Sequence, residues 1–373
     1  MAKFTCPYCF ENYASKEVKY VCPDCGAHAP PPGLFEKEPI KCKASGCGGL
    51  ATQRRCQKCD REIPKVALET PNLLFSIVGV SNSGKTNFIT VMLNELGKSS
   101  GLRLALGAQN KETRDHQNEN RRLIYNEHKS PGVTESGARM PQIWYIKNNM
   151  KKHRGFGGVN VPTYTFTIYD GAGEDHKNNL DPSSDMVRYI KASEAFLITL
   201  DPLTLENIRE GGFVSSDVMR NSLAGHGGEI ENASDIVNSL ADYIKQIHGI
   251  HTNKPLNVPV AVVLTKFDTL LSHPSFAANA RVKNSSLNIE NERIRETEFE
   301  EIHGEIKNWL EQIGEISFIV ALETHFGEKN FKLFAVSSYG ESPDNDKTIT
   351  KKINPHRVLD PILWLFKKAK FID

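Results

Sequence analysis

Short, continuous apolar runs recur along most of this chain and alternate with stretches patterned as helices. The runs that predict strands cover residues 73–79, 142–147, 163–169, 194–200, 258–264 and 331–336. The stretches that predict helices cover residues 85–97, 110–128, 231–248, 293–312 and 356–369. Strands that are apolar on both faces and alternate with helices are typical of α/β proteins. The pattern therefore predicts a mostly parallel sheet with helices on both faces.

The first 65 residues follow a different pattern. They hold all eight cysteines of the chain, as the pairs Cys6/Cys9, Cys22/Cys25, Cys42/Cys47 and Cys56/Cys59. The spacings C-x2-C and C-x4-C fold two thiolates onto one metal, and the proline and glycine in CPYCF and CPDCG favour tight turns. We therefore expect two structural Zn²⁺ sites, in a head (1–65) that precedes an α/β domain (66–373).

The grouping of the four cysteine pairs is open at this point. The simplest interpretation groups the first four and the last four cysteines, as two zinc ribbons in tandem joined by AHAPPPGLFEKEPI. An interleaved arrangement would join the first pair to the third and the second pair to the fourth. Four thiolates leave no coordination position for water, so we expect the head to bind a partner rather than to catalyse.

The head and the rest of the chain differ only modestly in net charge. Residues 1–65 hold 11 Lys+Arg and 7 Asp+Glu, a net of +4, and the remainder holds 35 and 38, a net of −3. The total of +1 argues against a polyanion binder as a whole, but it leaves a nucleic-acid partner open for the head. MAKFTCPYCF lacks the apolar segment of a signal peptide, and VPVAVVL is too short to span a bilayer. We expect a cytoplasmic protein.

The segment GVSNSGKT (79–86) lies between a predicted strand and a predicted helix. Its spacing, G-x-x-x-x-G-K-[ST], is that of a loop whose backbone N–H groups hold nucleotide phosphates. Lys85 is expected to reach the β and γ phosphates, and Thr86 to ligate Mg²⁺. The predicted nucleotide contacts of this segment are Gly79, Asn82, Ser83, Gly84, Lys85, Thr86 and Asn87.

A second segment, TFTIYDGAGED, ends another predicted strand. Asp170 is expected to hold Mg²⁺ through water, and the N–H of Gly173 to approach the γ phosphate. Glu174 follows directly. Its carboxylate could accept a proton from the attacking water, or its charge could weaken turnover, and both readings stay open.

Two further segments select the base. VAVVLTKFD ends in Thr265, Lys266 and Asp268, and one carboxylate can accept from both guanine N1–H and N2–H₂. The stem of Lys266 can lie over the base plane. FAVSSYG follows the last predicted strand, and Ser337 and Ser338 are expected to present a backbone N–H to guanine O6. The predicted nucleotide is therefore GTP.

These four motifs, in this order, make the chain resemble the translation-factor-related P-loop GTPases over about residues 70–340. Lys85 and Asp170 lie 85 residues apart, a longer spacing than small GTPases have. With the cysteine head, this enlarged pattern resembles the double-GTPase type of bacterial conflict systems. The resemblance implies a switch in which Thr134 senses the γ phosphate, while Ser130, Ser136 and Thr163 remain alternatives.

The resemblance implies a GTP-hydrolysing enzyme with GTP, Mg²⁺ and two Zn²⁺, whose head docks a protein partner. A scaffold or sensor that holds GTP with little turnover is the alternative. No arginine of the sequence can be assigned as the finger that stabilises the transition state. A partner or a second copy of the chain is expected to supply one, which leaves a nucleotide-dependent homo-oligomer open.

Overall fold

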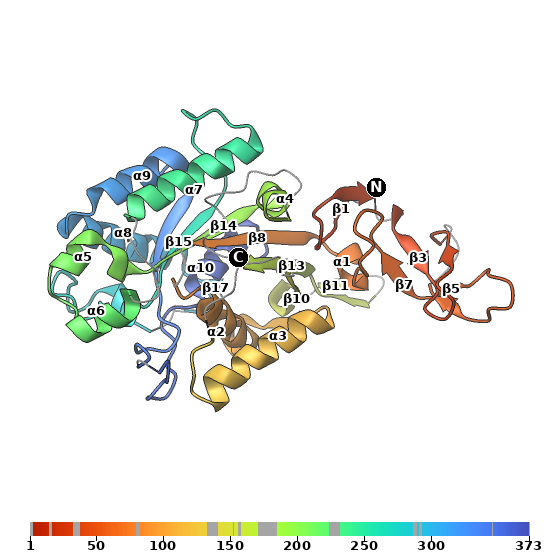
Figure 1. Ribbon diagram of the computed structural model, residues 1–373, viewed down its shortest axis with the longest axis horizontal. Coiled ribbons are helices and arrows are strands. Elements are labelled where there is room, and N and C mark those ends of the chain that lie inside the picture. Colours follow the sequence, from red (N-terminus) through yellow and green to blue (C-terminus); the bar gives the residue numbers. More distant parts are fainter. Residues whose placement is uncertain are drawn as a thin grey trace.

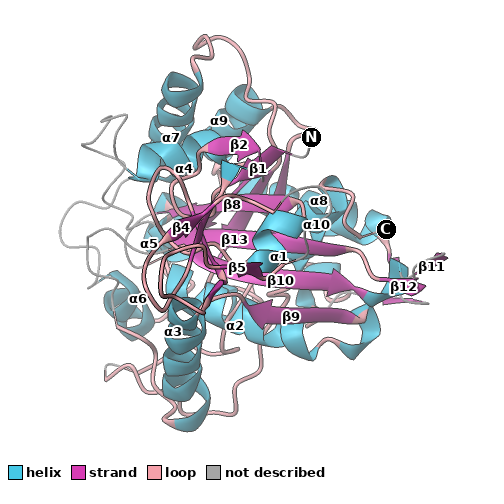
Figure 2. Ribbon diagram, turned by 90° about the vertical axis from the view of Figure 1, so that its right-hand side faces the viewer, coloured by secondary structure: helices cyan, strands magenta, loops and turns pink. Residues whose placement is uncertain are grey.

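A seven-stranded sheet forms the centre of the protein (Figures 1 and 2). The computed structural model describes residues 3–14, 17–32, 38–79, 83–132, 141–151, 153–155, 158–170, 185–223, 232–285, 289–290, 293–344 and 346–372. The strand order is β18 (Phe331–Ala335), β15 (Val260–Leu264), β14 (Ala195–Leu200), β8 (Asn72–Gly79), β13 (Thr163–Asp170), β10 (Gln142–Asn148) and β9 (Leu104–Ala108).

Most neighbours in this sheet run parallel. Strands β13, β8, β14, β15 and β18 pair in parallel, whereas β10 is antiparallel to both β13 and β9. The carboxyl ends of the five parallel strands therefore lie along one edge of the sheet. The predicted mostly parallel α/β fold is confirmed.

Helices cover both faces of the sheet. Along β8 the side chains alternate, so that Leu74 and Val78 join one apolar core while Phe75 and Ile77 join the other. The first core is closed by α4 (Asp185–Ala192), α7 (Ala233–His248), α9 (Ile316–Phe326) and most of α8 (Glu296–Gln312). The second is closed by α2 (Lys85–Lys98) and α10 (Asp360–Lys368).

The predicted strands and helices are all present, with ends shifted by a few residues. The predicted helix over 110–128 divides into α3 (Lys111–Arg121) and one π-helical stretch, η3 (Arg122–Asn126). Strand β9 and helices α4 and α9 were not predicted. The smaller elements of this part are α5 (Glu206–Glu210), α6 (Ser216–Leu223), η2 (Ser100–Leu102), η4 (Asn149–Lys151), η5 (Pro202–Thr204), η7 (Phe267–Thr269), η8 (Arg281–Lys283), β11 (His153–Gly155), β12 (Gly158–Asn160), β16 (Ile289–Glu290) and β17 (Arg293–Ile294).

The cysteine-rich head consists of short strands and turns at one end of the molecule (Figure 1). Its elements are β1 (Lys3–Thr5), β2 (Asn12–Ala14), β3 (Lys19–Val21), β4 (His28–Ala29), β5 (Ile40–Lys41), β6 (Leu50–Ala51) and β7 (Gln53–Arg55), followed by α1 (Lys65–Glu69). Ala67 and Ile143 share an apolar cluster with Phe4 and Cys56. The division at residue 65 stays a prediction, and this cluster shows that the two sides pack together.

Across the described ranges, every helix is too short or too polar to cross a bilayer.

Candidate functional site

The glycine-rich loop begins where β8 ends and closes where α2 begins. Gly84 has φ 76°, a left-handed conformation that favours glycine, and it caps α2. At Gly79, a Cβ atom would lie 2.3 Å from the carbonyl oxygen of Thr199 on β14. The backbones of β8 and β14 approach closely here, so glycine is required where the loop leaves the sheet.

The described residues of the loop form hydrogen bonds with residues at the ends of neighbouring strands. The Ser83 hydroxyl lies 2.9 Å from the Thr199 hydroxyl, and both are buried. Lys85 Nζ donates to the carbonyl of Gly79 at 2.9 Å, which folds the side chain back over the loop. Thr265 Oγ1 donates to the carbonyl of Ser83 at 2.7 Å. The phosphate-loop and base-selecting segments are therefore in direct contact.

The base-selecting segment follows β15 and is fixed by both of its neighbours. The N–H of Thr265 donates to the carbonyl of Leu200 at 2.9 Å, and Thr265 Oγ1 lies 3.1 Å from the same carbonyl oxygen. The N–H of Phe267, whose ring is fully buried, donates to the carbonyl of Val336 at 3.0 Å. Between them Lys266 adopts a left-handed conformation with φ 51°.

Asp268 is half-buried beside the loop that follows β18. Burial raises the pKa of its carboxyl, while a hydrogen bond from the Ser337 hydroxyl acts in the opposite direction. The charges of Asp201 and Lys266 are also close enough to act on this pKa, and they oppose each other. The structure thus brings Thr265, Lys266, Asp268 and the Ser337–Ser338 loop together.

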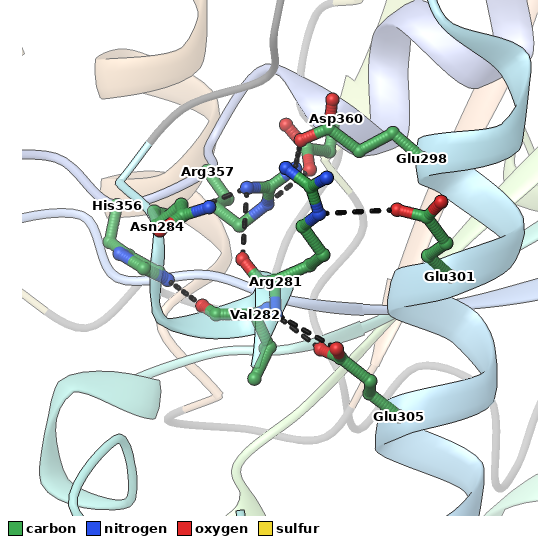
Figure 3. Close-up of polar contacts among 9 residues, drawn as sticks. All are labelled: Arg281, Val282, Asn284, Glu298, Glu301, Glu305, His356, Arg357 and Asp360. Carbon is green, nitrogen blue, oxygen red and sulfur yellow. Dashed lines mark hydrogen bonds and ion pairs between the residues drawn. The ribbon is translucent and has the colours of Figure 1, made fainter. Parts of the chain in front are cut away.

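A charge network centred on the buried Arg357 adjoins His356, which pairs with that loop (Figure 3). Ser337 and His356 exchange two backbone hydrogen bonds of 3.0 and 2.8 Å. The next residue, Arg357, is 2% exposed and pairs with Asp360 at 2.6 Å and Glu298 at 2.9 Å. Its guanidinium also donates to the carbonyl of Asn284 at 3.1 Å. Helices α8 and α10 are thereby joined behind the predicted base site.

Further contacts extend this network into the segment around η8. His356 Nε2 lies 2.8 Å from the carbonyl of Val282, and burial lowers the pKa of the ring to about 4. Glu305 accepts from the N–H groups of Arg281 and Val282, both at 2.8 Å, and Glu301 pairs with Arg281 at 3.3 Å. The segment between β15 and α8 is therefore anchored to α8.

The two predicted Mg²⁺ ligands lie at the same edge of the sheet. Thr86 is the second residue of α2, and Asp170 is the last residue of β13, where it pairs with Ile77 of β8. Only the backbone of Asp170 is described. A hydroxyl and a carboxylate are ligands that suit a hard cation such as Mg²⁺. Their assignment stays a prediction.

Four predicted site residues, Asn82, Thr134, Gly173 and Glu174, lie outside the described residues, as does the alternative Ser136. Ser130 lies close to α2, since its hydroxyl accepts from Asn87 Nδ2 at 2.9 Å and from Tyr339 at 3.3 Å. Thr163 begins β13, at the opposite end of that strand from Asp170. Its position argues against a role at the γ phosphate.

The cysteines form two clusters, but neither expected grouping is right. Cys6, Cys9, Cys56 and Cys59 form one cluster, which we call the proximal cluster. Cys22, Cys25, Cys42 and Cys47 form the other, the distal cluster. The clusters are thus nested rather than in tandem or interleaved. The reason is the antiparallel pairing of β3 with β7, which returns the chain to its starting point and places the fourth cysteine pair beside the first.

Both clusters fit a tetrahedral Zn²⁺ ion. Sulfurs about 2.3 Å from zinc in a tetrahedron lie about 3.8 Å apart. The separations are 3.9 Å for Cys6–Cys59, 3.6 Å for Cys9–Cys56, 3.8 Å for Cys22–Cys47 and 3.5 Å for Cys25–Cys42. In each cluster all four sulfurs lie within 4.8 Å of one another. The clusters differ in burial, because Cys6 and Cys56 are fully buried while Cys25 is exposed.

One residue of the proximal cluster's first turn enters the core of the α/β domain. Phe10 has φ 62°, a conformation that costs an aromatic residue about 1–2 kcal/mol. Its ring is buried and packs on Tyr189 of α4 with centroids 4.8 Å apart. Tyr189 in turn packs on Tyr169 at 4.7 Å and accepts from its N–H at 2.7 Å. These contacts connect the proximal cluster to the residue before Asp170.

Sequence reasoning missed two residues beside the nucleotide motifs. Asp201, which follows β14, is fully buried and pairs with Lys266 at 2.6 Å. The sequence offers a weak signal for it, an aspartate directly after an apolar strand. Arg357 lies within a stretch that was predicted as helix, and nothing in the local pattern indicates that its guanidinium is buried.

No protein-family model matches the chain, and no curated protein matches its sequence. Among solved structures it is similar to the bacterial selenocysteine-specific elongation factor EF-Sec, with 11% identity and a TM-score of 0.32 over 82% of this chain and 30% of that one. It is also similar to the S. cerevisiae Ski7 GTPase-like domain bound to GDP and inorganic phosphate, with 12% identity and a TM-score of 0.33 over 81% of this chain and 51% of that one. A third is the Arl6 BBS3 small GTPase from Trypanosoma brucei with bound GppNp, with 13% identity and a TM-score of 0.29 over 81% and 99%. The chain thus spans about a third of the EF-Sec chain and about half of the Ski7 chain.

Proposed function

We propose that this chain is a GTP-binding and GTP-hydrolysing switch whose cysteine-rich head docks a partner. The observation that carries the proposal is the meeting of three predicted nucleotide segments at the carboxyl edge of one parallel sheet. Thr265 donates to the carbonyl of Ser83, and the N–H of Phe267 donates to the carbonyl of Val336, next to Ser337. Segments that are far apart in sequence thus form one contiguous site.

Phosphate binding would use the loop and the start of α2. Backbone N–H groups at the amino end of a helix, together with its dipole, favour a phosphate there. The cation of Lys85, now turned onto the carbonyl of Gly79, would exchange that partner for phosphate oxygens. Thr86 and Asp170 would hold Mg²⁺, which neutralises charge on the phosphates when it is bound.

Guanine selection would rest on Asp268 and the loop after β18. A carboxylate accepts two hydrogen bonds from guanine N1–H and N2–H₂, whereas adenine has no matching pair of donors. Burial strengthens these bonds because water competes less there. The Ser338 N–H would face guanine O6. The two backbone hydrogen bonds between Ser337 and His356 support the loop in this position.

For hydrolysis we propose Thr134 and Gly173 as sensors of the γ phosphate. Glu174 would either accept a proton from the attacking water or slow the reaction by its charge, and a turnover assay separates these roles. The predicted arginine finger would come from a partner or from a second copy of the chain. Within this scheme the division into a head (1–65) and a GTPase domain (66–373) also remains our proposal.

The head would report the nucleotide state through α4. This helix is the first described element after the D-x-x-G motif, and Phe10 packs directly on its Tyr189. Order–disorder changes after that motif are a common way for a γ phosphate to switch a protein. The distal cluster is the more exposed of the two, and we propose it as the docking part. We further propose a cytoplasmic role of the double-GTPase type in a bacterial conflict system.

The test is turnover of purified zinc-loaded protein with Mg²⁺ and either GTP or ATP, over a range of protein concentrations. Turnover of GTP alone, rising more than linearly with concentration, supports a GTPase that assembles. Tight GTP binding without turnover supports the scaffold alternative. Equal turnover of ATP would show that Thr265–Asp268 does not select guanine.

A matched pair of variants sharpens this test. Asp268→Asn removes the carboxylate and should weaken GTP binding by about 100-fold, since hydrogen bonds to charged groups contribute about 1.5–3 kcal/mol each. Asp242→Asn makes the same change on the exposed face of α7 and should bind GTP like the wild type. GTP selectivity retained in the first variant would contradict the assignment.

A further inference from the structure

Asp201 stands directly after β14 and belongs to none of the four nucleotide motifs. It is 0% exposed, and its two carboxylate oxygens accept hydrogen bonds from different partners. Oδ1 accepts from the N–H of Leu203 at 3.0 Å and caps η5. Oδ2 lies 2.6 Å from Lys266 Nζ. A fully buried carboxylate that faces the base-selecting segment therefore holds its lysine.

The ion pair fixes the ammonium end of the Lys266 side chain, and the backbone end of this side chain is already fixed. The backbone on either side of Lys266 is anchored, through the hydrogen bonds of Thr265 to Leu200 and of Phe267 to Val336. A free lysine side chain samples many rotamers, and it loses this freedom when its end is held. With Nζ held by Asp201, the four-carbon stem is stretched between two fixed points before any nucleotide arrives.

We propose that Asp201 is a positioning residue for guanine nucleotides, acting through Lys266. It holds the stem as a flat apolar surface on which the base packs, and it keeps the ammonium from moving toward the phosphates. This inference rests on the proposed function, because it needs a guanine base at Asp268. It adds that affinity for the base depends on a carboxylate that does not itself touch the nucleotide.

The geometry makes a specific prediction about which nucleotides are affected. The lysine stem contacts the face of the base, so it does not distinguish bases by their edge groups. Loss of Asp201 should therefore weaken GTP and ITP by the same factor, although ITP lacks the exocyclic amino group. A general disturbance of the base pocket would instead move Asp268 and change the ratio of the two affinities.

The experiment is a double-mutant cycle on the full-length zinc-loaded protein. Asp201→Asn keeps an oxygen for Leu203 and removes the negative charge that pairs with Lys266, while Lys266→Met keeps an apolar stem and removes the ammonium. Dissociation constants for GTP, ITP and ATP are measured for the wild type, both single variants and the double variant. Unfolding temperatures without nucleotide are measured in parallel.

We expect Asp201→Asn to weaken GTP and ITP equally, by about tenfold, and Lys266→Met to do the same. The double variant should bind no more weakly than either single variant, because both changes remove the same contact. GTP affinity unchanged in Asp201→Asn, or full additivity in the double variant, would overturn the inference. If Asp201→Asn does not fold, wild-type affinity in Lys266→Met overturns it equally.

The wild-type measurement separates this inference from the proposed function. If the wild type binds ATP as well as GTP, the proposed function fails, and the inference fails with it. If the wild type selects guanine and the variants bind normally, only the role of Asp201 is wrong.

Discussion

Replacing Arg357 by methionine removes a cation that two buried carboxylates share. The guanidinium is 2% exposed and lies between Asp360 and Glu298, which are 1% and 3% exposed (Figure 3). Methionine fills part of the volume but offers no donor. The variant therefore leaves both carboxylates and the carbonyl of Asn284 without this partner. The loop that carries His356 and its pairing with Ser337 lies next to the change.

The expected cost is large because the pair is buried. Removing one partner of a buried ion pair costs about 3–5 kcal/mol, far more than the near-zero contribution of an exposed pair. Here one cation serves two carboxylates, so we expect the upper part of that range, about 4–5 kcal/mol at neutral pH. Such a loss is a substantial fraction of the total stability of a typical domain.

The stability lost in Arg357→Met should depend on pH. Burial raises the pKa of Asp360 to about 6, against a usual value of 3.8. A raised pKa means that protonation favours the folded chain, so the contribution of this group is present below about pH 4 and is lost as pH rises through about 6. Without the guanidinium the pKa of Asp360 rises further. In the variant the carboxyl is then protonated at pH values at which the wild type is ionised. The variant therefore loses less stability in mild acid.

The assay is urea unfolding of the zinc-loaded wild type and variant at about pH 5.5 and pH 8, with GTP affinity as a second readout. We expect a larger destabilisation at the higher pH and weaker GTP binding in the variant. Arg357→Met combined with Asp360→Asn should be more stable than Arg357→Met alone at the higher pH. A destabilisation below about 1 kcal/mol, or one equal at both pH values, would refute the reasoning.

Three further predictions concern the loop and the head. Gly79→Ala should destabilise the protein by about 1–3 kcal/mol in thermal unfolding, because its Cβ meets the backbone of β14, whereas Gly97→Ala, with nothing within 4 Å, should be neutral or stabilising. Phe10→Ala should cost about 3–5 kcal/mol by the same measurement if its ring is part of the main core, and zinc content should stay at two. Cys56→Ser should lose one zinc and lower the unfolding temperature of the whole chain, whereas Cys42→Ser should lose one zinc and leave the nucleotide-dependent unfolding unchanged.

The sequence predicted the central sheet well because its strands carry strong local signals. The ends of strand β8 and helix α2 lie within one residue of their predicted positions. Here an apolar run, a glycine-rich turn and a helical pattern follow one another directly in the sequence. Strand β9, with the sequence LALGA, lacks such a signal because it is short and rich in small residues. Helix α9 is apolar on nearly every side, so it shows no helical periodicity.

The grouping of the cysteines could not be predicted in the same way. Each C-x2-C turn is local, but the turn that completes its metal site is chosen by a distant strand pairing, β3 with β7. The same limit applies to the pairing of Asp201 with Lys266 and of Arg357 with Glu298, because these partners lie 65 and 59 residues apart in sequence. Chemistry that depends on a single long-range contact leaves little trace in the surrounding pattern.

The nested clusters have a consequence for how the head can vary. The chain leaves β3 at Val21 and returns in β7 at Gln53, and these two residues are direct cross-strand partners. The whole distal cluster is thus inserted between two adjacent points of a scaffold that the proximal cluster and the α/β domain already hold. A segment of different length could be inserted there without moving the predicted nucleotide segments of the α/β domain. The distal cluster can therefore vary in length and sequence while the α/β domain stays the same.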